Sequence, residues 1–301
     1  MGCSPCGAVS DCKPDSPDKA YSGVPLIKPH LQRKWDHSSE RSANEQRAEL
    51  VAAYIDEDVL DPELLASPPT RVPTAAEIAK ILEPWRPQKL RRIAAAHLLD
   101  HWSPWFVLRT HYGGGEADDI KLRTWLDAEG DAGDPAIVCP EYEWFCVLDD
   151  PELFDFGDYW HEMYDVLPEL AAPRADRRFT DDDVQEAREE GKYWITHGSE
   201  WDCMTDDERY QEAIMRTAVD KFGAAFLLVL DKDALDASEG GLILRDKKGN
   251  PVKESEINPN DLHEFIARSQ RGMFFEGHWE HGRPGYRYRL RGKIMRKLLP
   301  F

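Results

Sequence analysis

An unbroken apolar run from Ala224 to Leu230 is the sequence feature that most constrains the fold. The run is long enough for a strand buried on both faces and too short for a secure helix, so it predicts a strand in a sheet core. Two further short segments, Gly241–Arg245 and Pro251–Lys253, flank a polar turn in which Gly249 can supply a positive φ. This part of the chain therefore predicts an antiparallel hairpin beside the buried strand.

Helical patterns come first along the chain, and strand patterns begin at Trp105. Leu50, Val51 and Tyr54 form one stripe of a helix expected over 41–56, and a second helix is expected over 87–102. The aromatic and β-branched segment 105–112 predicts a strand that enters the glycine loop 113–115. Further strands are expected at 136–139, 143–148, 273–279 and 286–294, and further helices at 158–167, 180–191, 205–223 and 260–270. The order predicts an α+β fold in which N-terminal helices precede a mixed α/β body with a C-terminal antiparallel sheet.

Proline spacing and composition divide the chain into three parts. Residues 1–40 are rich in proline and lack apolar periodicity, which is typical of an extended arm. Residues 41–103 form a helical segment and residues 104–301 an α+β body, although 41–301 could also form one domain. No apolar run reaches the roughly 18 residues needed to cross a bilayer. With no secretory-type apolar stretch at the start, we expect a soluble intracellular protein without a membrane span.

The charge of the chain changes sign near its C-terminal end. The whole chain has a formal net charge of −19, whereas residues 271–301 carry eight basic and two acidic groups, so the other 270 residues carry −25. Such a negative surface repels nucleic acid, so any nucleic-acid contact is expected only locally at the C-terminus. The candidate partner-binding residues at this end are Arg283, Arg287, Arg289, Arg291, Lys293, Arg296 and Lys297.

The segment Tyr286 to Arg291 alternates strictly between an apolar or aromatic residue and an arginine. In a strand, a period of two would place the tyrosines on one face and the arginines on the other. Arginine forks bind carboxylate or phosphate at two points, so this face could hold an acidic protein surface. Pairing of the arginines with the chain's own acidic excess is the alternative.

Residues 141–190 carry the opposite charge to the C-terminal segment. They include 17 acidic and four basic residues, interleaved with aromatic ones. This composition predicts either an acidic surface over an aromatic core or a docking face for a basic partner. The residues expected to form this acidic surface are Glu141, Glu143, Asp149, Asp150, Glu152, Asp155 and Asp158.

Two groups of residues could bind a metal. Cys3, Cys6 and Cys12 crowd the first twelve positions and could take part in a tetrahedral zinc site. On the helix expected over 87–102, His97 and His101 share a face at i and i+4, where both could bind one metal. If neither group binds a metal, the cysteines are part of the extended arm and the histidines occupy packing positions on the helix. No cofactor-binding loop of a known type is present in the sequence, and we expect no cofactor besides zinc.

Taken together, these patterns favour a non-enzymatic structural or assembly protein. It would self-associate or bind a protein partner through the basic C-terminal strand and the acidic surface, as in a virion or another large particle. A metal-dependent hydrolase built around His97 and His101 is one alternative class. An acidic inhibitor that mimics nucleic acid is a further alternative.

Overall fold

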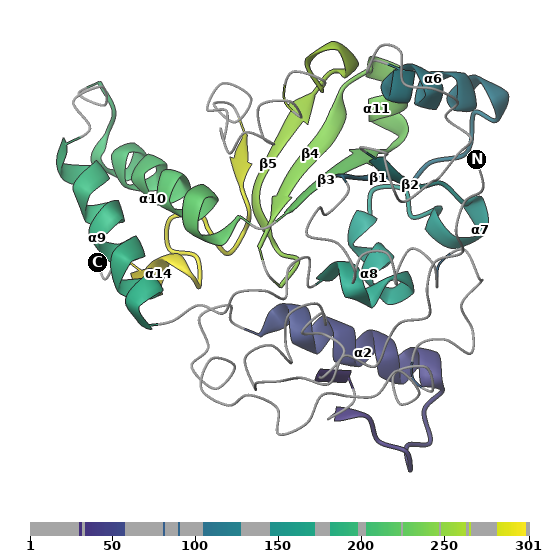
Figure 1. Ribbon diagram of the computed structural model, residues 1–301, viewed down its shortest axis with the longest axis horizontal. Helices are drawn as coiled ribbons and strands as arrows, with labels where there is room; N and C mark the ends of the chain where they lie inside the picture. Colours follow the sequence, from purple (N-terminus) through teal and green to yellow (C-terminus); the bar gives the residue numbers. More distant parts are fainter. Residues whose placement is uncertain are drawn as a thin grey trace, which may run out of the picture.

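The computed structural model describes residues 30–31, 34–57, 81, 90, 105–127, 145–171, 181–197, 203–223, 225–246, 248–262, 265 and 282–298. A mixed six-stranded sheet with helices on both faces forms the centre of the molecule (Figure 1). The strands are β1 (Trp105–Arg109), β2 (Phe145–Leu148), β3 (Ala225–Leu230), β4 (Gly240–Arg245), β5 (Pro251–Ile257) and β6 (Arg283–Pro284). The longer helices are α2 (Ala43–Asp56), α6 (Glu116–Asp127), α9 (Asp181–His197) and α10 (Asp206–Phe222). The predicted α+β class is confirmed.

Short helices complete the described elements. They are α7 (Pro151–Phe154), η2 (Trp160–Glu162), α8 (Met163–Val166), η3 (Pro168–Ala171), α11 (Lys232–Ala237) and α14 (Met295–Leu298). In the described part of the chain, no helix has a stretch that is both long and apolar enough to cross a membrane.

The sheet is half parallel and half antiparallel, with the strand order β2-β1-β3-β4-β5-β6. Strand β1 lies parallel to both β2 and β3, and every pair from β3 to β6 is antiparallel. The apolar run predicted as a buried strand is β3, in the middle of the sheet, and Leu227, Leu228 and Leu230 are almost completely buried. The parallel half positions the candidate site, because three carboxyl ends meet at one edge.

Alternate residues of the strands pack into two separate cores. Val107 and Leu228 face a core that also contains residues of α6, α9, α10 and α14. Phe106 and Leu227 face the opposite core, which contains residues of α2, α7, α8 and η3. The period of two along each strand therefore divides the helices into two layers, one on each face of the sheet.

Local sequence signals explain where several elements begin. Ser42 starts α2 and Thr205 starts α10, and each makes a capping box with a glutamate three residues later. The hairpin between β4 and β5 turns at Gly249, whose φ of 79° confirms the predicted positive φ. The predicted strands at β1, β2 and β3 and the helix beginning at Thr205 are likewise confirmed.

The structure corrects the prediction for residues 286–294. They form successive turns instead of a strand, and within the described residues 282–298 only Arg283–Pro284 pairs with β5. Arg291 has a φ of 73°, which a strand does not allow, and Arg287 is buried among polar groups that replace the backbone pairing of a strand. The alternation of tyrosine and arginine is therefore not a strand pattern here.

Two helices also differ from expectation. Helix α9 was expected to end near Gly191, but it continues to His197 with Gly191 buried inside it. Contact with α10 along its length explains this, because packing outweighs the cost of about 1 kcal/mol for one helical glycine. Helix α6 directly follows the glycine loop, in a segment for which we predicted no element. The predictions for residues 1–29, 58–80, 136–139 and 273–279 lie outside the described residues.

Candidate functional site at the carboxyl ends of the parallel strands

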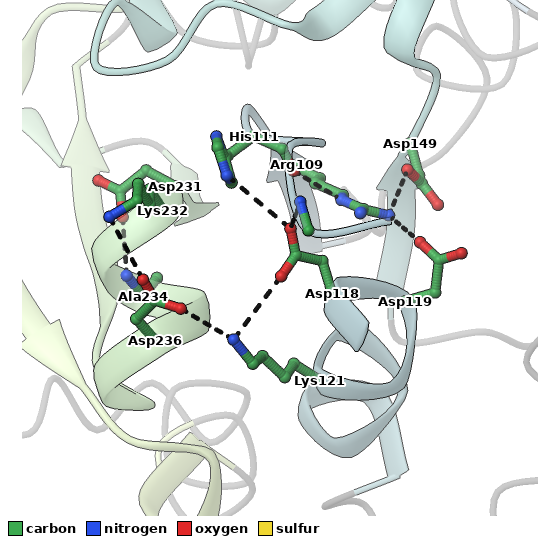
Figure 2. Close-up of polar contacts among 11 residues, drawn as sticks. Arg109, His111, Asp118, Asp119, Lys121, Asp149, Asp231, Lys232, Ala234 and Asp236 are labelled. Carbon is green, nitrogen blue, oxygen red and sulfur yellow. Dashed lines mark hydrogen bonds and ion pairs between the residues drawn. The ribbon is translucent and has the colours of Figure 1, made fainter. Parts of the chain in front are cut away.

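The carboxyl ends of the three parallel strands bring polar residues together at one edge of the sheet (Figure 2). Arg109 is the last residue of β1, Asp149 directly follows β2, and Asp231 directly follows β3. The backbone N–H of Thr110 donates to the carbonyl of Leu230, which continues the pairing of β1 with β3 beyond the last residue of β1. This edge is where open sheets with parallel strands bind their ligands. We call it the strand-edge site.

The guanidinium of Arg109 lies at the centre of this site. Its side chain is only 3% exposed, and Nη1 lies 2.6 Å from Oδ1 of Asp119 and 3.4 Å from Oδ1 of Asp149. Its Nε donates to the carbonyl of His111 at 2.9 Å. Since a buried charge requires partners, these contacts tie β1 to α6 and to the end of β2.

Tyr112 supports the same guanidinium from the following loop. Its ring centroid lies 4.4 Å from Cζ of Arg109, and its hydroxyl donates to the carbonyl of Arg109. The same hydroxyl accepts the backbone N–H of Asp150 at 2.9 Å. Burial, together with the negative charge of Asp149, raises the pKa of Tyr112 above its usual value. Tyr112 therefore remains protonated at neutral pH and links two strand ends.

The glycine loop before α6 places His111 beside a buried carboxylate. The side chain of Asp118 is 5% exposed, and its Oδ2 accepts the backbone N–H of Gly114 at 2.7 Å. A side chain at position 114 would collide with this carboxylate, and Gly115 has a positive φ, so both glycines are needed. Nε2 of His111 lies 3.8 Å from the same Oδ2, which is an ion-pair distance and too long for a hydrogen bond.

Lys121 extends the site to the end of β3. Its Nζ lies 3.6 Å from Oδ1 of Asp118 and 2.9 Å from Oδ1 of Asp236 on α11. The hydrogen bond to Asp236 raises the pKa of Lys121, and the same bond lowers the pKa of Asp236. Asp231 caps α11 by accepting the N–H of Ala234.

The strand-edge site carries more negative than positive charge. Five aspartates lie among three cations and one histidine (Figure 2): Asp118, Asp119, Asp149, Asp231 and Asp236 with Arg109, Lys121, Lys232 and His111. Asp119 and Asp236 are about half exposed, so part of this charge reaches solvent. The site therefore favours a cationic group and disfavours a phosphate.

The predicted acidic surface begins at this edge and continues onto α7. Asp149 and Asp150 follow β2, and Asp150 caps α7 by accepting the N–H of Glu152. Exposed residues then follow in sequence, namely Glu152, Asp155, Asp158 and Tyr159. Tyr159 is 71% exposed, which is unusual for an aromatic side chain. Glu141 and Glu143 lie outside the described residues. We call residues Asp149, Asp150, Glu152, Asp155 and Asp158 the acidic edge.

The predicted basic residues separate into one buried arginine and six exposed cations. Arg287 is 2% exposed, and its Nη2 lies 2.8 Å from Oδ1 of Asp56 while its Nη1 donates to the carbonyl of Glu57. Both acceptors lie at the C-terminal end of α2, where cations are favoured. The exposed set, which we call the basic segment, is Arg283, Arg289, Arg291, Lys293, Arg296 and Lys297.

A second polar group, which sequence reasoning missed, surrounds the buried turn between β4 and β5. Both oxygens of Asp246 are occupied: Oδ1 accepts the N–H groups of Lys248 and Asn250, and Oδ2 accepts the hydroxyl of Tyr288. Nζ of Lys248 reaches Oε2 of Glu57 at 2.8 Å. We call this group, together with Arg245 and Arg287, the hairpin-turn cluster. The sequence signal for it was the charged turn Asp246–Asn250, which we interpreted only as a turn.

The predicted metal ligands are not placed by the structure. Cys3, Cys6, Cys12, His97 and His101 all lie outside the described residues. Among the described residues, no group of three or more His, Cys, Asp or Glu side chains has a geometry that could hold a metal ion. Comparison of the chain with known protein families, with curated proteins and with solved structures finds no match.

Proposed function

We propose that this chain is a non-enzymatic assembly protein that associates head to tail. In this arrangement the acidic edge of one copy receives the basic segment of the next. The observation that carries the proposal is the separation of the two charged surfaces. Helix α7, which carries part of the acidic edge, and helix α14, which carries part of the basic segment, lie on opposite sides of the molecule along its long axis (Figure 1).

Because of this separation, the part of the basic segment on α14 does not pair with α7 within one molecule (Figure 1). Opposite charges on two copies attract and orient the encounter, and they contribute to specificity more than to affinity. Each surface also includes an exposed tyrosine that could be buried on contact, Tyr159 beside the acidic edge and Tyr286 beside the basic segment. Aromatic side chains of this kind are enriched at protein interfaces.

The first half of the basic segment is the better candidate for contact. Helix α14 contacts α9, which is rich in acidic residues, and the side chain of Arg188 on α9 donates to the carbonyl of Lys297. Arg283, Arg289 and Arg291 are exposed, and the carboxylate that interacts with the first two is Glu254 on β5. Arg287 holds the segment on α2 and is not available to a partner.

Association of two different surfaces is heterologous, so it closes into a ring or continues as a filament. A role as a component of a virion or another large particle fits this geometry and belongs to the same proposal. Nucleic acid fits less well as the partner, since the remaining 270 residues carry a net charge of −25.

Charge exchange between two variants tests the proposal. One variant carries Glu152→Lys, Asp155→Lys and Asp158→Lys, and the other carries Arg283→Glu, Arg289→Glu and Arg291→Glu. In either variant alone, the edge and the segment carry charges of the same sign. The copies therefore repel one another, and we expect each variant to sediment as a monomer. In an equimolar mixture, the reversed edge of one variant attracts the reversed segment of the other, and the two unreversed surfaces also attract. We expect the mixture to recover the assembly that wild type forms at low salt.

Sedimentation velocity at several salt concentrations provides the measurement. Wild type that remains monomeric at low salt, or a mixture that shows no recovery, would contradict head-to-tail association. Arg287 is left unchanged because reversing this buried charge would disturb the fold itself.

A further inference from the structure

The side chain of Arg245, at the end of β4, is completely buried and only partly paired. Its Nη1 donates to the hydroxyl of Tyr164 at 3.3 Å and to the carbonyl of Leu170 at 3.0 Å. The tyrosine hydroxyl in turn donates to the carbonyl of Gly249 at 2.6 Å. These bonds fix one nitrogen of the guanidinium between the hairpin and the α8–η3 segment.

The other two nitrogens of this guanidinium, Nε and Nη2, have no hydrogen-bond partner in the described part of the chain. Their N–H groups lie on the same side of the planar group, where they form the fork that binds two oxygens at once. An arginine stays charged at any pH that a protein survives, so it cannot relieve this burial by losing its proton. Leaving such donors unpaired is costly.

The nearest carboxylate in sequence does not meet this need. Asp246 follows Arg245 directly, but both of its oxygens are occupied by Lys248, Asn250 and Tyr288. A register shift between Leu244 and Arg245 in the pairing of β4 with β5 marks an irregularity at this position. Irregularities of this kind redirect a side chain and are common beside binding sites.

A further buried donor lies on the helix that covers the same turn. The hydroxyl of Tyr54 on α2 has no hydrogen-bond partner among the described residues, and Tyr54 is 1% exposed. Burial, with the charges of Glu57 and Asp246, raises the pKa of Tyr54, so its hydroxyl stays protonated and can donate. The ring of Tyr54 lies 3.6 Å from Nζ of Lys248 in the hairpin turn.

We propose that the fork of Arg245 binds an oxyanion, the carboxylate or phosphate group of a small molecule. The ligand would lie beside Nε and Nη2, on the edge of the guanidinium that faces away from Nη1 and its partners Tyr164 and Leu170. Two parallel N–H donors select a group with paired oxygens over a spherical anion. This site is independent of the head-to-tail assembly and goes beyond it.

The side-chain Nε–Hε resonance of Arg245 in the 15N-labelled protein reports on the fork directly. The resonance is assigned by its absence from the spectrum of Arg245→Lys, a change that keeps the charge and removes the fork. If that variant does not fold, the resonance is assigned through bonds in the wild-type protein. The protein is titrated separately with inorganic phosphate, acetate and chloride at constant ionic strength. Each sample is equilibrated first, because access to a buried group requires local opening.

We expect phosphate or acetate to shift this resonance to saturation before the Nε–Hε resonances of the exposed Arg283 and Arg291 begin to move. The ion that acts at the lower concentration identifies the class as phosphate or carboxylate. A resonance that stays in place with both oxyanions overturns the proposal. A resonance that moves equally with chloride also overturns it, because simple charge attraction then explains the shift.

Discussion

The strand-edge site and the hairpin-turn cluster use the same kinds of side chain for opposite purposes. Both contain an arginine beside aspartates, but Asp119 in the first is about half exposed, whereas Asp246 in the second is completely buried. At the edge, solvent can hydrate Asp119 when the pair separates, and the buried Arg109 keeps Asp149 and the His111 carbonyl as partners, so the contact with Asp119 remains exchangeable. In the turn, every broken contact leaves a buried polar group without water. Burial therefore distinguishes contacts that can exchange with solvent from contacts that hold the fold.

Replacement of Asp246 by alanine should have the largest effect. The change leaves the hydroxyl of Tyr288 and two backbone N–H groups unpaired in the interior, so we expect a loss of about 3–5 kcal/mol in the free energy of unfolding. The matched change at the edge, Asp119→Ala, should cost about 1 kcal/mol or less, because Arg109 keeps Asp149 and the His111 carbonyl. Urea denaturation measures both. Equal losses would show that burial is not what distinguishes the two regions.

Arg287→Ala should have the second-largest effect, a loss of about 2–4 kcal/mol in the free energy of unfolding. It removes the cation that holds the C-terminal segment on Asp56 and Glu57 at the end of α2. Arg291→Ala, four residues later and exposed, is the control and should change stability by about 0.5 kcal/mol at most.

Hydrogen exchange locates the effect of the Arg287 change. We expect faster exchange of the α2 amides in Arg287→Ala and unchanged exchange in β1 and β3, since only the packing of α2 depends on this cation. Uniformly faster exchange throughout the sheet would instead assign Arg287 a role in the whole core.

The smallest expected effect is the pH dependence of stability. As the pH rises, the contribution of Asp246 falls and that of Asp236 increases. Burial raises the pKa of Asp246 above its usual 3.8, so its contribution to stability is greatest below pH 3.8 and falls as the pH rises through its folded-state pKa. The hydrogen bond from Lys121 lowers the pKa of Asp236, so its contribution is present above pH 3.8 and falls as the pH drops through the lower folded-state pKa.

The unfolding free energies of Asp246→Asn and Asp236→Asn, measured relative to wild type between pH 3 and pH 6, should therefore show slopes of opposite sign. Carboxyl-carbon titration by NMR gives the two pKa values directly. Slopes of the same sign would mean that burial of Asp246 is outweighed by its hydrogen bonds.

The sequence predicts elements whose signals are local. The helix start at Thr205, the apolar run of β3 and the positive φ of Gly249 each depend on a few neighbouring residues, and each is confirmed. Signals that depend on distant partners misled the prediction. The Tyr286–Arg291 alternation has strand periodicity, but the partners of Arg287 lie some 230 residues away in α2 and override it.

The candidate site was predictable only in part for the same reason. Asp149, Asp150 and Glu152 stand out in the sequence because acidic residues crowd that stretch, and the structure places them at the end of β2. Arg109, His111 and Asp118 have no comparable motif. They meet the acidic edge because β1 pairs in parallel with β2, which is a long-range contact that no local pattern specifies.

The docking of α2 against the hairpin turn and the C-terminal segment also has a consequence for biosynthesis. Lys248 and Arg287 reach Glu57, at the end of α2, over sequence separations of 191 and 230, and Lys293 reaches Asp56 over 237. A chain that emerges from the ribosome at roughly 5–20 residues per second therefore makes α2 early and completes its binding surface tens of seconds later. During that interval Asp56 and Glu57 at the C-terminal end of α2 lack their native cations, whereas the apolar stripe with Val51 and Tyr54 can already pack on α8 and η3.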